Sequence, residues 1–409
     1  MSVAFFLAGM FGFVSMLFNN TVLQSMQLPS TDSFVPLLRD GIDVYLGDDE
    51  DLVFVFLTTR KRVKVACLPC LVRIIPRLNG NTSLGDLLVG LDPDTQNKAI
   101  SFLAYLREKG IVVNGSWLDD LELPSPYKKK LERFATFLLD TVGSEYEASE
   151  ALHRIHAAKI ALVGVGSVGS WMVRTLNMVG FRRFILIDGK LATNAVREVF
   201  PSSSGESQSK AEQVAILLRE IDPHVEVSFR RQTIRPDLEE QFSLDGVDLL
   251  INAADEPYVG YVNTLLCRIA LHKGIPFFAA GGFDAHLGCH GELTIPGQTP
   301  CTDCYTRFFQ RSLTDWKPVD HPVSDRRLGF GGLPSLSAYA AAQGVMTILR
   351  HFLNLSEEPG GRAEFLFRNN TTDRFRVERD PDCPTCANIS QPTLRRVASL
   401  KTTQVLANA

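Results

Sequence analysis

The sequence predicts an α/β fold, an open sheet with helices between most of its strands, preceded by a small α+β domain. Two observations predict the sheet. From residue 159 onward, short apolar runs alternate with helical patterns, which is the order of βαβ units. The run 159–163 leads into a glycine-rich turn at 164–169, and a second run, 184–187, ends at Asp188. Strand, glycine turn, helix, strand and acid in this order predict a Rossmann-like nucleotide-binding sheet.

Length and composition set the outer bounds. The 409 residues are enough for two or three domains, and 45% apolar with 22% charged residues is ordinary for a globular protein. The net charge of -4 gives no indication of a nucleic-acid partner. The short basic run 128–130 is interpreted as a solvated helix face rather than a phosphate site.

The first 33 residues form an apolar amino-terminal extension. Residues 3–18 are almost wholly apolar, but the run is short for a membrane span and no Lys or Arg precedes it. We favour, in this order, an upstream extension with Met26 as the true start, a packed helix, and a membrane anchor. The expectation is therefore a cytoplasmic protein without a membrane partner.

Residues 34–118 are predicted to form a small winged helix-turn-helix domain. The pattern gives three strands, then three helices, then a closing strand. The expected ranges are 42–46, 52–57 and 60–65 for the strands, 67–78, 83–90 and 95–109 for the helices, and 111–113 for the last strand. A polar helical connector follows over 119–158.

Residues 159–400 are predicted to form the domain with the open sheet. Its expected strands are 160–164, 184–188, 225–229, 247–252, 276–280 and 290–295. A Pro/Gly-rich crossover at 316–334 precedes an Ala-rich helix at 335–352 and a short strand at 363–368.

The glycine turn indicates a nucleotide as ligand. Gly164 and Gly166 let the backbone approach a phosphate, and the following helix, expected to start near residue 170, offers free N–H groups to it. Gly169 completes the motif, and Asp188 stands where an acid holds ribose hydroxyls. The glycines alone leave NAD and ATP open.

Polar residues farther along suit phosphate chemistry. Arg197 can bind phosphate oxygens through two N–H groups, and Lys210 adds a point charge for a transferred phosphoryl group. Asp255 follows an apolar strand, where open sheets bind ligands, and could hold Mg²⁺. Asn194 can hydrogen-bond phosphate or ribose. Each residue alone is more often a surface ion pair or a helix cap, whereas the ordered set favours function.

Six of the eight cysteines lie in C-x-x-C pairs, which favours metal thiolates in a reducing compartment. Cys301, Cys304, Cys383 and Cys386 supply the four thiolates of a closed zinc site, although the long gap leaves free cysteines open as an alternative. Cys67 and Cys70, at an apolar helix start, are interpreted as core residues rather than a redox pair, and Cys267 is expected in a helix and Cys289 in a strand.

These motifs in this order resemble the ubiquitin-activating-like adenylating superfamily that includes ThiF, MoeB and HesA. The resemblance covers about residues 155–390 and rests on the glycine turn, Asp188, an N-x-x-R at 194–197, a K-x-E at 210–212, Asp255 and the two cysteine pairs. It implies ATP and Mg²⁺ as cofactors, a structural Zn²⁺ on the four cysteines, and catalytic roles for Arg197, Lys210 and Asp255. The chain departs from the family at Lys190, where a second acid is usual, and the segment before 194–197 is shortened.

Two further features narrow the expected activity. Between Cys304 and Cys383 the chain has no cysteine, so a thioester step is not expected. The amino-terminal domain resembles the PqqD-like recognition domains of peptide natural-product pathways, and its fusion to the sheet domain is similar to MccB and PaaA. Such domains bind a leader peptide as an added strand, here near 53–56. A packing domain and a DNA-binding winged helix are the alternatives, and the latter lacks a basic recognition helix.

The resemblance therefore implies ATP-dependent adenylation of a carboxyl group on a ribosomally made precursor peptide, with a pantocin-like ring or a microcin-like conjugate as outcome. The alternatives are an activator of a ubiquitin-like sulfur carrier and a non-catalytic leader-binding scaffold. A NAD-linked oxidoreductase leaves 194–197 and 210–212 unexplained. Relatives are homodimers in which an arginine of one copy reaches the phosphates of the other, so Arg133 or Arg154 is expected to do so here. The helix at 335–352 is expected to offer a small-residue face for close packing between the two copies.

Overall fold

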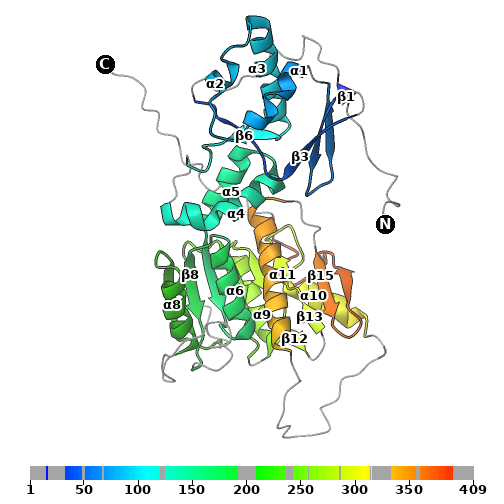
Figure 1. Ribbon diagram of the computed structural model, residues 1–409. Coiled ribbons are helices and arrows are strands. Elements are labelled where there is room, and N and C mark those ends of the chain that lie inside the picture. The colour runs from blue at the N-terminus through cyan, green and yellow to red at the C-terminus, as the bar shows by residue number, and fades with distance from the viewer. Residues whose placement is uncertain are drawn as a thin grey trace. The chain divides into compact units, whose positions relative to one another are not determined.

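The computed structural model divides the chain into two compact units, Met1–Ala151 and Leu152–Ala409, which Figure 1 shows as ribbons. It describes residues 15–16, 33–47, 51–66, 69–119, 125–191, 209–235, 243–256, 258–284, 287–313, 315, 333–355 and 360–389. Within these ranges no helix is both long enough and apolar enough to cross a membrane.

The first unit is a small α+β structure. Its strands are β1 Ser15–Met16, β2 Pro36–Leu38, β3 Ile42–Leu46, β4 Leu52–Phe56, β5 Arg62–Val65 and β6 Val112–Asn114. Its helices are α1 Pro69–Val72, a 3-10 turn Ile75–Arg77, α2 Leu84–Leu88, α3 Pro93–Glu108 and α4 Ser125–Val142, and α5 Glu145–Ala157 crosses the boundary between the units. One sheet has the order β1-β5-β4-β3, and β2 pairs with β6.

Local chemistry accounts for most of these boundaries. The Asp92 side chain accepts hydrogen bonds from the main-chain N–H groups of residues 94 and 95 and so caps α3, whose first residue is Pro93. The single helix expected at 67–78 is wrong, because the described residues 69–78 form α1 and a separate 3-10 turn. Pro76 lacks the N–H group that a continuous helix would use at that position.

The core of the first unit lies between α3 and the sheet. Phe102, Leu103 and Leu106 on α3 are buried at helical spacing, and they join Phe34 and Phe54 in one apolar cluster. At its edge the buried Arg39 pairs with Asp140 of α4 and donates a hydrogen bond of 2.6 Å to the carbonyl of Gly110. The pair joins α4 to the rest of this unit.

The second unit is built on a six-stranded sheet of order β14-β11-β10-β7-β8-β9, in which every neighbouring pair except β11 with β14 is parallel. The strands are β7 Lys159–Val163, β8 Arg183–Ile187, β9 Glu226–Arg230, β10 Leu249–Asn252, β11 Phe277–Ala279 and β14 Glu292–Thr294. All six lie within two residues of the expected ranges. The Rossmann-like sheet predicted from the sequence is therefore confirmed.

Helices cover both faces of this sheet. Right-handed crossovers place α6 Ser167–Met178 and α8 Lys210–Ile221 on one face and α9 Val259–His272 on the other. α11 Pro334–Phe352 packs beside α6, as Figure 1 shows. The core under α9 contains alternate residues of β7 and β8 and also the four paired cysteines.

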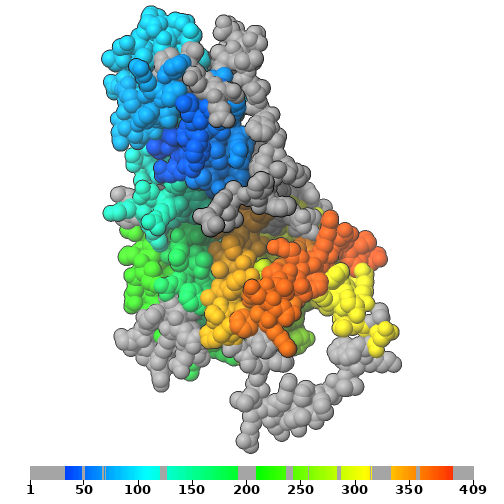
Figure 2. All heavy atoms as spheres, turned by 45° about the vertical axis from the view of Figure 1, so that its right-hand side comes forward, coloured from blue at the N-terminus to red at the C-terminus, as the bar shows by residue number. Residues whose placement is uncertain are grey.

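A second, antiparallel sheet in this unit was not predicted. Its order is β12-β13-β15-β16, with β12 Phe283–Asp284, β13 Leu287–Cys289, β15 Gly361–Leu366 and β16 Thr371–Arg376. The strand expected at 363–368 corresponds to β15. The β15–β16 hairpin packs on α10 Thr302–Arg311, where the rings of Phe309 and Phe375 are 5.5 Å apart, and Figure 2 shows both on the same face. Arg362 links β15 to Glu292 of β14 with a 2.6 Å ion pair.

Candidate active site

The carboxyl ends of β7, β8 and β10 form one edge of the sheet, and the site is built there. Along the chain β8 follows β7 on one side, whereas β10 joins β7 on the other side. This reversal of strand order is the point at which open α/β sheets bind ligands. Main-chain hydrogen bonds join the three strand ends, from Gly164 to the carbonyl of Ile187 at 2.8 Å and from Ala253 to that of Val163 at 2.7 Å.

The glycine loop lies between β7 and α6. Gly164 has φ of +83°, and a Cβ atom there would come within 2.5 Å of the main-chain nitrogen of Ala254. A Cβ on Gly169 would meet the carbonyl oxygen of Gly164 at 1.9 Å. At Gly166, in contrast, a Cβ would meet no described atom within 4 Å. Gly166 is also the N-cap of α6 and supplies no side chain to its first N–H groups, which suits a phosphate in that space.

Asp188 is held by the loops around it. One carboxylate oxygen accepts the main-chain N–H of Val165 at 3.0 Å, and the other accepts that of Lys190 at 2.8 Å. A carboxylate has about four positions for accepted hydrogen bonds, so both oxygens keep capacity for ribose hydroxyls. The two bonds fix the acid against the glycine loop, as the ribose role requires.

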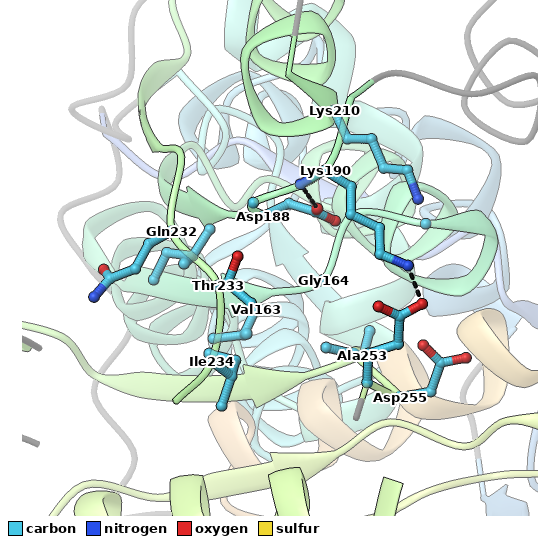
Figure 3. A pocket seen from close by; sticks show the side chains of 15 residues that line it. Val163, Gly164, Asp188, Lys190, Lys210, Gln232, Thr233, Ile234, Ala253 and Asp255 are labelled. Atoms are coloured by element: carbon cyan, nitrogen blue, oxygen red, sulfur yellow. Dashed lines mark hydrogen bonds and ion pairs between the residues drawn. The ribbon is translucent and has the colours of Figure 1, made fainter. Parts of the chain in front are cut away.

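A pocket opens at this edge of the sheet, and its empty volume is about 540 Å³ when the space at its open mouth is included. Figure 3 shows its lining. Residues of the glycine loop, the β8 end, the segment 232–234 and the β10 end contribute, as does the first residue of α8. The residues expected to bind a nucleotide that line it are Gly164, Gly166, Asp188, Lys210 and Asp255.

Lys210 and Asp255 are the two catalytic candidates that the described structure brings together. Lys210 begins α8, a helix that Ser209 caps by accepting the N–H of Glu212 at 3.2 Å. Among the described residues, neither the Lys210 ammonium nor the Asp255 carboxylate has a hydrogen bond or an ion pair within the chain. Both charges are therefore available to a ligand in the pocket.

The turn before Asp255 is shaped by Asn252, whose structural role sequence reasoning missed. Its buried side chain accepts the N–H of Ala254 at 3.1 Å and donates to the Asn263 side chain at 2.6 Å. The pairing of an amide with an amide on the following helix orients the strand end. The N-x-x-D pattern at 252–255 is the signal that marks this turn.

The remaining candidates do not line the described pocket. Asn194 and Arg197 lie outside the described residues. Arg133 is exposed on α4 of the first unit. Arg154 on α5 donates a 3.1 Å hydrogen bond to the carbonyl of Phe352 at the end of α11, a packing contact within the second unit.

The four paired cysteines are buried and form one cluster. Their sulfur atoms all lie within 4.8 Å of one another, with Cys301 to Cys383 at 3.5 Å and Cys304 to Cys386 at 3.4 Å. A tetrahedral zinc site with Zn–S bonds of about 2.3 Å needs sulfurs about 3.8 Å apart. Disulfide sulfurs would be about 2.05 Å apart. The cluster therefore fits a zinc ion, and these four residues would hold it.

Contacts around the cluster favour negative charge on one sulfur, that of Cys304. The N–H of Asp380 donates to the Cys304 sulfur at 3.4 Å. A hydrogen bond from Cys301 is the main cause that lowers the pKa of Cys304 to about 5. The two cysteine loops are also joined to each other, because Asp303 of the first accepts from Thr385 of the second and from Arg268 at 2.9 Å. The pattern of cysteines alone did not predict these contacts between the two loops.

Neither remaining described thiol is a candidate nucleophile. Cys267 lies in α9, and burial raises its pKa to about 11. Cys289 lies in β13, and burial also raises the pKa of this thiol. Both thiols therefore stay protonated near neutral pH. The amino-terminal pair, Cys67 and Cys70, falls outside the side chains that the structure describes.

One expectation about the first unit needs correction. Residues 53–56 were expected near the edge that receives a peptide strand, but β4 pairs with β3 on one side and with β5 on the other. Both ladders of β4 are used, so it cannot accept a further strand. The described edges of this sheet are β1 and β3, and β3 exposes Tyr45 and Leu46.

Comparisons with known proteins bear on the fold and the family of this chain. The vegetative HesA protein of Trichormus variabilis is 28% identical over 253 residues, which cover 59% of this chain and 85% of HesA. E. coli MccB, solved with ATP, superimposes with a TM-score of 0.62 at 17% identity, over 86% of this chain and 99% of MccB. PaaA gives a TM-score of 0.62 at 16% identity, over 84% and 100% of the two chains.

The structural likenesses show that the fold extends over nearly the whole of MccB and PaaA. The evidence for the family comes from a sequence model of the ThiF family, which matches residues 141–385. These residues contain the glycine loop, the pocket and three of the four paired cysteines. This match spans more than half of the chain, and the chain belongs to the ThiF family.

Proposed function

We propose that this chain is an ATP- and Mg²⁺-dependent enzyme that adenylates a carboxyl group of a ribosomally made precursor peptide. The observation that carries the proposal is the pocket at the switch point, in which a glycine loop, Lys210 and Asp255 face one volume. The family match and the likeness to MccB, whose solved structures include complexes with ATP and with the MccA peptide, support it.

The reaction needs few groups from the protein. A peptide carboxylate oxygen attacks the α-phosphorus of ATP, the bond from that phosphorus to the bridging oxygen breaks, and pyrophosphate leaves. The product is an acyl adenylate, and a nucleophile that attacks its carbonyl carbon displaces AMP. Lys210 and the α6 amino terminus would stabilise the negative charge that develops on the phosphoryl oxygens. Asp255 would hold Mg²⁺, which neutralises the phosphates.

The peptide would be captured by the first unit on the edge of β3. Along the β3–β4 ladder, Gly47 donates to the carbonyl of Asp51 at 2.7 Å, and Leu57 donates to that of Gly41 at 2.9 Å. Antiparallel ladders alternate, so Asp43 and Tyr45 direct their N–H groups toward β4, and Val44 and Leu46 direct theirs away from it. The outward N–H groups are the donors that an added leader strand needs. In this proposal PaaA and MccB are the models for the outcome, a ring or a conjugate.

An assay of released products tests the reaction. With the precursor peptide, Mg²⁺ and ATP, we expect pyrophosphate and AMP or an adenylate, and we expect neither without peptide. ADP in place of AMP would contradict adenylation. Pyrophosphate release with a sulfur-carrier protein, and none with any peptide, would instead establish the alternative activator.

A second experiment tests leader capture. Val44→Pro removes an outward main-chain N–H group of β3, whereas Tyr45→Pro removes one that faces β4, and the alanine variants at both positions keep the N–H groups. We expect Val44→Pro to bind the leader peptide at least about tenfold more weakly than Val44→Ala, because a ladder hydrogen bond and its neighbours are lost. An affinity of Val44→Pro equal to that of Val44→Ala, with ATP binding intact, would show that the β3 edge does not receive the leader.

A further inference from the structure

An ion pair crosses the nucleotide pocket between two loops that belong to non-adjacent strands. The Lys190 ammonium pairs with the Glu256 carboxylate, and the dashed line from the side-chain nitrogen of Lys190 in Figure 3 marks this contact. Lys190 follows the end of β8, and Glu256 follows the end of β10. The strand between them in the sheet is β7, which leads into the glycine loop. The pair therefore spans about two strand spacings, roughly 10 Å, over the point at which a phosphate would enter.

Both ends of the pair are attached to anchored loops. The Lys190 main chain donates to Asp188 at 2.8 Å, and its carbonyl accepts the N–H of Lys210 at 2.9 Å. On the other side, Asn252 fixes the turn that leads through Ala254 to Glu256. A link between the two side chains thus restrains the distance between Asp188 and Asp255.

The charges in the pocket divide into two sets. Three carboxylates and two ammonium groups line it, those of Asp188, Asp255, Glu256, Lys190 and Lys210. Lys190 and Glu256 neutralise each other, and Asp188 accepts two main-chain N–H groups while keeping capacity for ribose hydroxyls. This leaves Lys210 and Asp255 as the pocket charges without a partner among the described residues. The internal pair is thus distinct from the charges that face the ligand.

We propose that the ion pair of Lys190 and Glu256 acts as a latch: it orders the two loops before the nucleotide binds and so strengthens nucleotide binding. They act as positioning residues, and neither contacts the nucleotide. The inference rests on the proposed function in one respect, that the ligand is ATP with Mg²⁺. Both side chains are more than half exposed, so the effect on affinity is modest, about two- to fivefold.

A charge-exchange cycle distinguishes the latch from direct binding. Lys190→Ala and Glu256→Ala should each raise the Kd for Mg²⁺-ATP about two- to fivefold in calorimetry at low salt, and the double alanine variant should lose no more than either. The double variant Lys190→Glu with Glu256→Lys should return the Kd to within about twofold of the original. Near 1 M salt all differences should shrink, because the Debye length falls to about 3 Å. An unchanged Kd in Glu256→Ala, or a charge-exchanged protein as weak as Lys190→Ala, would overturn the latch.

A readout without nucleotide separates the latch from the proposed function. In the free protein, amide hydrogen exchange of residues 189–191 and 253–256 should become faster in both single alanine variants and return to the original rate after charge exchange. Unchanged exchange would refute the latch whatever the ligand is. If the original protein fails to bind ATP, the proposed function fails, and the exchange rates still decide whether the latch exists.

Discussion

The nucleotide pocket and the cysteine cluster lie in the same unit, but they differ in the burial of their side chains and in the partners that these side chains have. The four thiols are 0 to 2% exposed, and Asp303, Thr385 and Arg268 join the two loops that carry them. In the pocket, Lys210 and Asp255 have no partner among the described residues, and Gly166 faces open space. A closed, fully partnered cluster suits a structural metal, whereas charges left without partners suit a ligand that comes and goes.

The largest expected effect is loss of the metal. Protein purified without chelator should contain one zinc per chain, and Cys383→Ser should remove it and lower the free energy of unfolding by about 5 kcal/mol or more. Structural zinc sites contribute apparent binding energies of about 10–16 kcal/mol, and one lost thiolate opens the site. Elemental analysis and thermal denaturation measure both quantities.

Cys289→Ala is the matched control, because this buried thiol lies in β13 outside the cluster. It should keep the zinc. A metal-free protein with unchanged melting temperature and full activity would show that the cluster is not a zinc site.

The second effect concerns the unpartnered charges. Lys210→Ala and Asp255→Ala should each lower ATP-dependent pyrophosphate release on the order of 100-fold, about 2.7 kcal/mol of transition-state stabilisation, with the melting temperature unchanged. Lys273→Ala, which removes an exposed lysine at the end of α9, should leave the rate unchanged. If either pocket variant unfolds at a lower temperature by several degrees, its side chain is part of the structure, and the contrast with the cysteine cluster weakens.

A pair of glycine substitutions separates folding from binding within the pocket itself. Gly164→Ala places a methyl group against Ala254 in a left-handed conformation, so it should destabilise the protein by about 1–3 kcal/mol. Gly166→Ala meets no described atom and has φ of -70°, so the fold should persist while the methyl group occupies the space of a phosphate. Urea denaturation should therefore show the larger effect for Gly164→Ala, and nucleotide binding should be weakened with an intact fold in Gly166→Ala. Equal loss of stability in both would contradict the phosphate position.

The sequence predicted the features whose cause is local. The strands β7, β8 and β10 are largely apolar runs because a parallel sheet buries both of their faces, and each run leads into a loop that lines the site. The glycine loop and Asp188 follow from their spacing within one βαβ unit. In each case one short segment contains the whole signal.

Features that depend on strand order were not predictable. Lys190 and Glu256 meet because β8 and β10 lie on either side of β7 in the sheet. Nothing near either residue in the sequence indicates the other. β16 was missed because its exposed, polar sequence has no apolar alternation. Residues 53–56 were expected near the peptide-receiving edge, but β4, the most apolar strand of its sheet, is an interior strand with partners on both sides.

The smallest change in measured activity, a partial recovery on mixing two variants, tests whether two copies of the chain share one pocket. The described pocket contains one ammonium, that of Lys210, free for phosphates, and the family resemblance implies an arginine from a partner copy, for which Arg133 on α4 is the candidate. In a two-fold dimer each pocket would combine Asp255 of one copy with Arg133 of the other. Arg133→Ala and Asp255→Ala proteins should therefore each be nearly inactive when assayed alone.

An equal mixture of the two variants, after subunit exchange, should regain about a quarter of the original activity. Half of the dimers would be hybrids, and each hybrid would have one intact pocket of two. Lys130→Ala on the same helix is the control, because it also removes a positive charge from α4, and its mixture with Asp255→Ala should show simple dilution of active protein. A mixture of Arg133→Ala and Asp255→Ala no more active than its components, or a fully active monomer in light scattering, would restrict the pocket to a single chain.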